Sequence, residues 1–407
     1  MILFLLDFSG ESDMKPLSGM KVLDMTHVLA GPYCTYQLGM LGAEIVKVET
    51  PRGDMVRGWG GSEAQLDEGL GSGFVAQNAG KKSIVVDMKI EEGAALLRRL
   101  AGEFDIIVQN YRPGTMARYG LDFDTVVAGN PGVVYASISA MGAHGPLSHR
   151  PGFDDVVQAT SGFMSINVRG DGPIRTGGPV LDYATGMHAT SAILAAVMMQ
   201  RATGEAQHVD IAMQDVTLLL MNRNTHISAT TGKAPLPAGN REAPMLGRFA
   251  AKEGYVMLAG YLPHHCRSLC RAIGLDEEAQ WSAKQFAQRG AELEQRVEAQ
   301  LLKRTAAEWD QIFAAAGVVG GGVAMLDDVA ASEHIAERGL FSTRDSAAGA
   351  QRVTNAGYRI NGEMYGPGPG VPRLGQDTAA VLKDVGFDDA EIEQLVASGA
   401  IGQPRGV

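Results

Sequence analysis

The sequence contains few cysteines and no excess of positive charge. Three of its 407 residues are cysteine. That is too few for the disulfide frameworks of small secreted domains, so we expect a protein of the reducing cytoplasm. The formal net charge is −11, and a chain with this excess of acid is repelled by nucleic-acid phosphates and anionic lipids. We therefore expect neither nucleic acid nor a membrane among its partners.

Long apolar runs are also missing. No segment reaches the roughly 20 apolar residues that a membrane-spanning helix needs. The run from Ile2 to Leu6 is short, has no basic residues before it and is followed at once by Asp7, which does not fit a signal peptide. We expect residues 1–15 to form a disordered N-terminal extension.

Three common site motifs are absent. The turn from Thr26 to Pro32 follows the first expected strand without the G-x-G-x-x-G of dinucleotide-binding proteins, which disfavours NAD although Glu49 ends the next strand. No G-x-S-x-G marks a serine nucleophile. The ligand-type residues between His264 and Cys270 include adjacent histidines that leave a helix on different sides, and no second cluster completes four ligands. We expect no metal site.

Short apolar strands alternate with helices over the first 140 residues. This pattern predicts an α/β fold whose large domain is Rossmann-like, with a parallel sheet covered on both faces. The expected strands are residues 21–26, 44–49, 83–88, 104–110 and 133–139. Helices are expected over residues 33–41, after the first strand, and later over residues 214–229. Ligands bind beyond the carboxyl ends of such strands, so we expect the site in the segments that follow Thr26, Glu49, Asn110 and Ser139.

Two Gly-rich segments divide the chain. Proline and glycine cluster between residues 232 and 247, and glycines recur between residues 317 and 322, as in linkers. We expect residues 16–230 to form the first part of the large domain. Residues 235–326 then form a smaller α+β domain. We expect in it a hairpin over residues 249–261, with its turn at Lys252-Glu253-Gly254, and helices, the last of which begins at a capping box of Thr305 and Glu308. Residues 327–407 return to complete the large domain.

A carboxylate stands at the beginning of one expected helix. Gly177, Gly178 and Pro179 lead to Asp182, and small residues follow in the helix expected over residues 184–201. Backbone N–H groups at a helix start favour an ionised carboxylate. Such a carboxylate can be a nucleophile or an ordinary N-cap, and the residues alone leave both open.

Basic residues lie beside several expected strand ends. Lys81 and Lys82 precede one strand, and Arg112 and Arg118 follow another. Guanidinium and ammonium groups placed there suggest a ligand that carries phosphate. The alternative is an ordinary solvated surface.

Taken in order, these segments resemble the family III CoA-transferases of the CaiB–BaiF type, from Pro16 to about Ile401. The most specific piece is the run NYRPGTM, which begins at Asn110. The runs LGAEIVKVE at residues 41–49, PGFD at 151–154 and VDIAM at 209–213 also match.

The resemblance implies that Asp182 is a nucleophile that attacks an acyl-CoA thioester. An aspartyl mixed anhydride forms first, an aspartyl-CoA thioester forms next, and CoA then passes to a free carboxylic acid. Coenzyme A is thus substrate and product, with no permanently bound cofactor. The resemblance also implies an intertwined homodimer. It assigns CoA binding to Val28, Leu29, Ala30, Lys82, Asn110, Arg112 and Arg118, and the substrate pocket to Met141 and Phe153.

The departures from the family pattern bear on the substrate. Leu29 and Ser139-Ala140-Met141 stand where formyl-CoA:oxalate transferases carry Gln and Lys-Gly-Tyr, so apolar Leu29 and Met141 favour a larger acid such as a C4–C5 dicarboxylate. Phe153 stands where related 2-methylacyl-CoA racemases carry a histidine, and phenylalanine cannot exchange a proton. A racemase or isomerase on acyl-CoA, and a CoA-binding protein without turnover, remain as alternatives.

Overall fold

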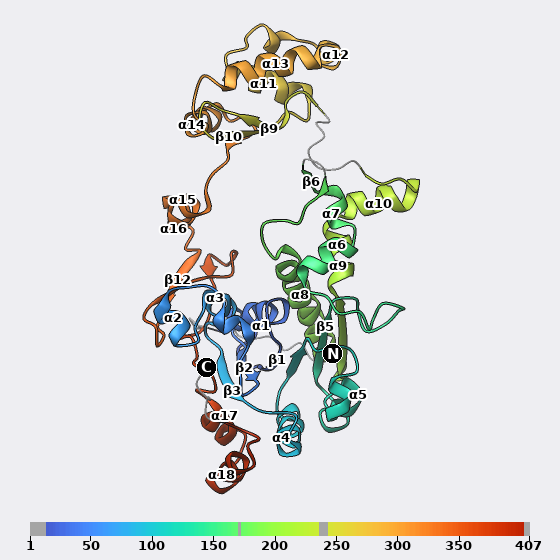
Figure 1. The fold of residues 1–407 in the computed structure, drawn as a ribbon, viewed down its shortest axis with the longest axis vertical. Coiled ribbons are helices and arrows are strands. Elements are labelled where there is room, and N and C mark those ends of the chain that lie inside the picture. Colours follow the sequence, from blue (N-terminus) through green and yellow to red (C-terminus); the bar gives the residue numbers. More distant parts are fainter. Residues whose placement is uncertain (1–13, 170–171, 236–242, 403–407) are drawn as a thin grey trace, which may run out of the picture. The chain divides into compact units, whose positions relative to one another are not determined.

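The computed structural model describes residues 14–169, 172–235 and 243–402. The expected extension therefore lies outside the described residues up to residue 13, as do residues 236–242 of the first expected linker. The chain divides into two units (Figure 1): residues up to 164, 175–234 and from 338 onward form the first, and residues 165–174 and 235–337 form the second. The return to the first unit thus begins at residue 338, where we had placed it at 327.

The first unit is built on a parallel sheet of six strands in the order β3-β2-β1-β4-β5-β8. This confirms the predicted α/β class and the Rossmann-like sheet. Its strands are β1 (Lys21–Met25), β2 (Glu44–Glu49), β3 (Lys82–Val85), β4 (Ile106–Gln109), β5 (Val134–Ser139) and β8 (Gln207–Ala212). The strand β8 was not predicted, because it is an edge strand whose first half alternates between partly and fully exposed residues and so lacks a buried apolar run.

Helices cover both faces of this sheet because alternate strand residues point to opposite sides. Val22 packs with α1 (Ala30–Met40) and α8 (Val180–Thr203) on one face. Leu23 packs with α4 (Glu91–Ala101), α5 (Phe123–Gly129) and α17 (Thr378–Asp384) on the other. The strand order reverses between β1 and β4, and the carboxyl ends of these two strands flank the crevice where such folds bind ligands.

Two helices begin earlier than predicted. Helix α1 begins at Ala30, ahead of the expected Tyr33, because Pro32 falls in the first turn, where its missing N–H would have no helical partner. Helix α8 begins at Val180, so Asp182 lies inside its first turn. The helix expected from residue 214 to residue 229 is divided at Met221 into α9 (Met213–Leu220) and α10 (Asn222–Thr231).

The remaining elements of the first unit are short. They are η1 (Met55–Gly58), α2 (Glu63–Asp67), α3 (Ser72–Asn78), η2 (Met116–Tyr119), α6 (Asp154–Thr160), α7 (Phe163–Ile166, which reaches the unit boundary), β12 (Phe341–Arg344), β13 (Gln351–Thr354), β14 (Arg359–Ile360), β15 (Glu363–Met364) and α18 (Asp389–Ser398). Among the described residues, no helix combines the length and the apolar character that crossing a bilayer requires.

The second unit has its own core around a three-stranded antiparallel sheet, β11-β10-β9. The predicted hairpin is present as β9 (Leu246–Ala250) and β10 (Tyr255–Ala259), and the predicted capping box of Thr305 and Glu308 begins α14. Gly320–Gly322 form the third strand β11. The other elements are β6 (Val168–Arg169), β7 (Gly172–Pro173), α11 (Pro263–Ala272), η3 (Glu278–Gln280), α12 (Ala283–Gln288), α13 (Gly290–Leu301), α14 (Ala306–Ala316), α15 (Leu326–Ala331) and α16 (Glu333–Glu337).

Candidate active site

The side chain of Asn110 bridges the crevice between β1 and β4. Its Oδ1 accepts a hydrogen bond from the His27 backbone N–H at 2.9 Å, and its Nδ2 donates to the His27 carbonyl at 2.8 Å. Asn110 was predicted to bind CoA. The structure shows that both ends of its amide hold the turn that follows β1.

That turn contains a strained residue. Val28 has φ +69°, a left-handed value that is a genuine outlier for a β-branched side chain. The Val28 N–H lies 3.2 Å from each carboxylate oxygen of Asp54, and its carbonyl accepts from Gln77 Nε2 at 3.2 Å. Val28 and the next two residues, Leu29 and Ala30, are all buried. The turn is therefore fixed on both sides of the unusual torsion.

Helix α8 packs closely against the beginning of α1. A Cβ atom added to Gly186 would lie 2.7 Å from the Ala30 carbonyl oxygen and 3.2 Å from the Cys34 nitrogen, so only glycine permits this approach. Asp182 lies one helical turn before Gly186 on α8, and the Ala30 backbone is near enough to lower the pKa of its carboxyl group. The structure thus brings Asp182 together with the predicted segment Val28–Ala30.

The N-cap role at α8 belongs to another residue. Asp154 Oδ2 accepts from the backbone N–H groups of Leu181 at 2.7 Å and Asp182 at 3.0 Å. Asp154 is 4% exposed and begins α6. Sequence reasoning missed this role because Asp154 lies 27 residues before Leu181, whose N–H it binds; the only signal was its place in the matched run PGFD. Since Asp154 binds these N–H groups at the beginning of α8, the Asp182 carboxyl group does not cap its own helix.

The protonation of Asp182 differs from our expectation. Burial, and next the negative charge of Asp154, raise the pKa of Asp182 from 3.8 to about 7, although the Ala30 hydrogen bond offsets part of this rise. The prediction that helix N–H groups keep the carboxylate ionised was wrong, because those groups donate to Asp154. At neutral pH, Asp182 is thus poised between its protonated and nucleophilic forms.

A cavity of about 610 Å³ lies at the carboxyl edge of the sheet. Its lining includes His27, Asn110, Arg112, Arg150 and Phe153, and Phe153 is 63% exposed. The size is that of a small-molecule or cofactor site. Two exposed guanidinium groups, Arg112 and the unpredicted Arg150, can hold phosphate or carboxylate oxygens by paired hydrogen bonds. Arg150 follows the expected strand end at Ser139, and this placement was the signal that could have identified it.

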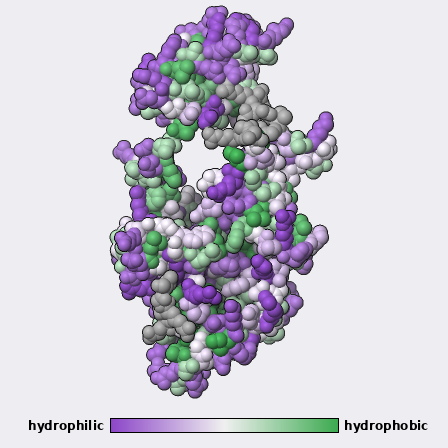
Figure 2. All heavy atoms as spheres, viewed as in Figure 1, coloured by the Kyte–Doolittle hydropathy of each residue, from purple (hydrophilic) through white to green (hydrophobic). Residues whose placement is uncertain are grey.

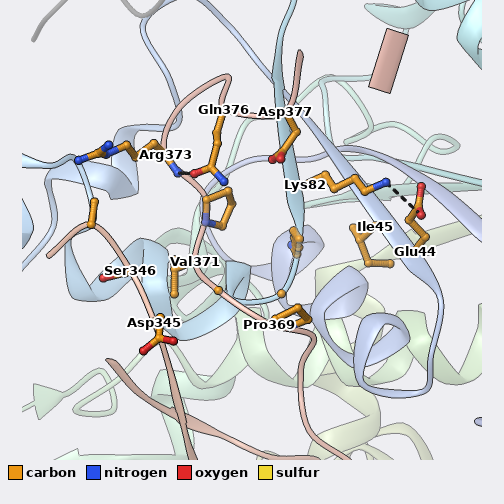
Figure 3. A pocket seen from close by; sticks show the side chains of 15 residues that line it. Glu44, Ile45, Lys82, Asp345, Ser346, Pro369, Val371, Arg373, Gln376 and Asp377 are labelled. Carbon is orange, nitrogen blue, oxygen red and sulfur yellow. Dashed lines mark hydrogen bonds and ion pairs between the residues drawn. The ribbon is translucent and has the colours of Figure 1, made fainter. Parts of the chain in front are cut away.

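The structure does not bring every predicted residue to this cavity. Lys82 is the first residue of β3, at the opposite edge of the sheet, and its Nζ lies 3.1 Å from Glu44 and 3.6 Å from Asp384. Figure 3 shows the Lys82 ammonium group turned toward Glu44 in a separate cavity of about 560 Å³.

Two further predicted residues, Arg118 and Met141, differ in how far they are buried. Arg118 is exposed and donates to Thr115 Oγ1 at 3.3 Å. Met141 is buried in the core with α1 and α8, so Phe153 is the better exposed of the two predicted pocket residues. Within the described ranges, no group of three or more His, Cys, Asp or Glu side chains is placed to hold a metal ion.

Comparison with known proteins gives consistent matches along the chain. The sequence model of CoA-transferase family III matches residues 17–378. The chain is 32% identical to succinyl-CoA:glutarate CoA-transferase of Mus musculus over 401 residues, covering 96% of this chain and 91% of the relative. It is 33% identical to acetyl-CoA:oxalate CoA-transferase of Acetobacter aceti over 392 residues, covering 92% and 97%. A crystal structure of a CAIB/BAIF family protein from Brucella suis superposes with a TM-score of 0.79 at 29% identity, covering 91% and 99%.

Proposed function

Because the chain belongs to CoA-transferase family III, we propose that it transfers CoA from an acyl-CoA thioester to a free carboxylic acid with Asp182 as the nucleophile. One observation carries this proposal. The Asp182 carboxyl group is buried beside the first turn of α1, while Asp154 accepts from the N–H groups at the beginning of α8, the helix that carries Asp182. A carboxylate freed from capping and facing backbone donors is suited to acyl transfer.

The proposed reaction proceeds by four balanced exchanges. A carboxylate oxygen of Asp182 attacks the thioester carbon, the C–S bond breaks, and CoA leaves as the thiolate with a mixed anhydride on the enzyme. The thiolate attacks the aspartyl carbonyl, which releases the donor acid and forms an aspartyl-CoA thioester. The acceptor carboxylate then displaces CoA to give a second anhydride. The thiolate attacks the acceptor carbonyl, which yields the new acyl-CoA and restores Asp182.

The surroundings of Asp182 suit these intermediates. Anhydride and thioester both hydrolyse, so the buried position of Asp182 protects them from water. The Ala30 N–H, at the beginning of α1, is close enough to donate to an oxyanion formed at the aspartyl group. We propose that Val28, Leu29 and Ala30 lie along the thioester arm, and that Arg112, Arg118 and Arg150 contact the phosphates of CoA. Lys82 is left out of this site because it begins β3 and so lies at the amino edge of the sheet, away from the cavity that Arg112 and Arg150 line.

We propose C4–C5 dicarboxylates as substrates. The apolar side chains of Leu29 and Phe153 support this class, as does the similarity to a relative named for succinyl and glutaryl substrates. The chain is also similar to a relative named for acetyl-CoA and oxalate, so a C2 acid is the main alternative to a C4–C5 dicarboxylate as substrate. A panel of succinyl-, glutaryl-, acetyl-, formyl- and oxalyl-CoA against the free acids tests the choice. Turnover restricted to formyl or oxalyl thioesters would overturn it.

The nucleophile is tested by trapping. The enzyme is incubated with acyl-CoA and then with hydroxylamine or borohydride, and the modified peptide is mapped by mass spectrometry. Modification at Asp182 supports transfer. Deuterium entering the α-carbon from solvent would instead indicate the racemase or isomerase, and CoA binding with neither result would indicate a binding protein.

We also propose a homodimer in the cytoplasm, with CoA-bearing substrates as its small-molecule partners. Apolar side chains reach the surface of the first unit (Figure 2). Met187, Met198 and Met199 of α8 and Leu219 and Leu220 of α9 are each more than half exposed, which is unusual for helices without a partner. Light scattering tests this proposal, and a monomer at micromolar concentration would contradict it.

A further inference from the structure

We propose that four side chains, Lys47, Asp54, Gln77 and Asn110, act as positioning residues that hold the turn after β1 in its strained shape. We call these residues the turn clamp. The inference rests on the proposed function, because the strained turn leads directly into Ala30, whose carbonyl packs against Gly186 one helical turn after Asp182 on α8.

The turn clamp accounts for nearly all the backbone hydrogen bonding of the turn. Thr26, His27 and Val28 offer three N–H and three carbonyl groups, and side chains bind all six. Asp24 Oδ1 accepts from Thr26 at 3.0 Å and Lys47 Nζ donates to the Thr26 carbonyl at 2.8 Å, while Asn110, Asp54 and Gln77 bind the other four groups. Turns normally satisfy such groups with their own backbone or with water, so this arrangement fixes the turn from outside.

The clamp residues come from separate elements. Lys47 lies on β2, Asp54 caps η1, Gln77 lies on α3 and Asn110 follows β4. Lys47 Nζ lies 3.1 Å from Asp54 Oδ2, and both side chains are at most 1% exposed. A buried ion pair gives little net stability compared with apolar residues of the same size. The pair is better explained by the two backbone groups that it holds.

The held torsion has a direct consequence for the reaction. A valine at φ +69° returns to an extended or helical backbone unless the surroundings prevent it. That change would turn Leu29 and the Ala30 N–H away from Asp182. A shift of about 1 Å in a reacting group can cost roughly a hundredfold in rate. The turn clamp therefore acts on turnover through Ala30 and touches no reacting atom itself.

A matched pair of charge-free variants tests the clamp. Both carry Lys47→Met; one adds Asp54→Leu and the other adds Asp54→Asn. The two lose the ion pair equally, but only asparagine keeps an oxygen for the Val28 N–H. We expect the leucine variant to lose about tenfold or more in kcat, with a smaller change in KM for acyl-CoA, and the asparagine variant to recover most of kcat. Equal kcat values in the two folded variants would overturn the inference.

Relief of strain supplies a second readout that a structural role would not give. Adding Val28→Gly to the leucine variant should raise its kcat severalfold, because glycine adopts φ +69° without restraint. No recovery would contradict the clamp. Ser83→Ala is the structural control. Its Oγ donates to Glu49 at 2.7 Å within the same buried layer but does not touch the turn, so the Tm should fall while kcat stays within about twofold.

Trapping at Asp182 separates this inference from the proposed function. If the parent enzyme is modified at Asp182 and the leucine variant is modified at the same rate, the turn clamp is wrong and the nucleophile stands. If the parent is not modified at Asp182 at all, the proposed function fails and the inference fails with it.

Discussion

Two turns of this protein require a left-handed residue and obtain it in different ways. The hairpin between β9 and β10 uses Gly254 at φ +78°, and the turn after β1 uses Val28 at φ +69°. Gly254 adopts its torsion without strain. The turn that contains Val28 is held by side chains from four other segments, and two of these, Asp54 and Gln77, bind Val28 itself. The difference indicates that the first turn is built for a fixed position beside Asp182, whereas the hairpin only reverses the chain.

The largest effect is expected at the carboxyl group that the first turn faces. Asp182→Asn keeps the size and polarity of the side chain but removes the nucleophile. We expect CoA transfer to fall by about a thousandfold or more, as measured by product formation from acyl-CoA and free acid. Circular dichroism and CoA binding should match the parent, and turnover close to the parent's would refute the nucleophile.

A smaller loss is expected at Asp154, which holds the start of α8. Asp154→Ala should reduce kcat by about tenfold or more, because Asp182 loses its fixed position, and should cost about 1 kcal/mol of stability as a lost cap. Asp154→Asn is the matched control, since its oxygen can still accept from the Leu181 and Asp182 N–H groups. If the alanine and asparagine variants have equal kcat, the positioning role is wrong.

The pH dependence of activity reports the pKa of Asp182. With that pKa raised to about 7 and the ionised form as nucleophile, kcat/KM should rise about tenfold from pH 6 to pH 8. In Asp154→Asn the rise should move to lower pH, because the neighbouring negative charge is gone. A flat profile in the parent over this range would contradict the assignment.

The same shift predicts a cost in stability. The pKa of Asp182 is about 7 in the folded chain and 3.8 in its ordinary environment. Between these pH values the unfolded chain releases a proton that the folded chain keeps. The free energy of unfolding therefore falls as pH rises from about 4 to 7. Asp182→Asn does not have this pH-dependent loss of stability. It should be more stable than the parent at pH 8, by on the order of 4 kcal/mol, with little difference at pH 4. Urea unfolding at both pH values checks this.

The smallest effect on activity is expected at the hairpin. An alanine at position 254 would have to adopt the left-handed φ of +78°, and its Cβ would lie 3.1 Å from the Ala306 Cβ. Gly254→Ala should therefore lower the free energy of unfolding by about 1–2 kcal/mol. Because the hairpin belongs to the core of the second unit and Asp182 to the first, kcat should stay within about twofold of the parent. A large loss of kcat with the fold intact would break the comparison between the two turns.

Local patterns in the sequence predicted much of the fold and part of the site. Apolar periodicity and turn residues, which act over a few positions, predicted five of the six strands of the parallel sheet. They also predicted the hairpin with its glycine and the capping box at Thr305. The importance of Asp182 came from a resemblance, since its own segment left both a cap and a nucleophile open.

What the sequence did not reveal depends on distant contacts. The cap from Asp154, the raised pKa of Asp182 and the side chains that hold Val28 join residues 26 to 83 positions apart along the chain. Lys82 was grouped with the phosphate-binding residues by its position near a strand, but it begins β3 and so lies at the amino edge of the sheet. Which end of a strand a residue occupies decides whether it can reach the crevice.

The most direct test of the account is trapping of the covalent intermediate. The parent enzyme is mixed with succinyl-CoA, treated with hydroxylamine or borohydride, and digested for mass spectrometry, with Asp182→Asn and Asp154→Asn carried in parallel. The account predicts modification at Asp182 in the parent and in Asp154→Asn, and none at position 182 in Asp182→Asn. Turnover of succinyl-CoA with no modification at Asp182, or with modification at another carboxylate, would contradict it.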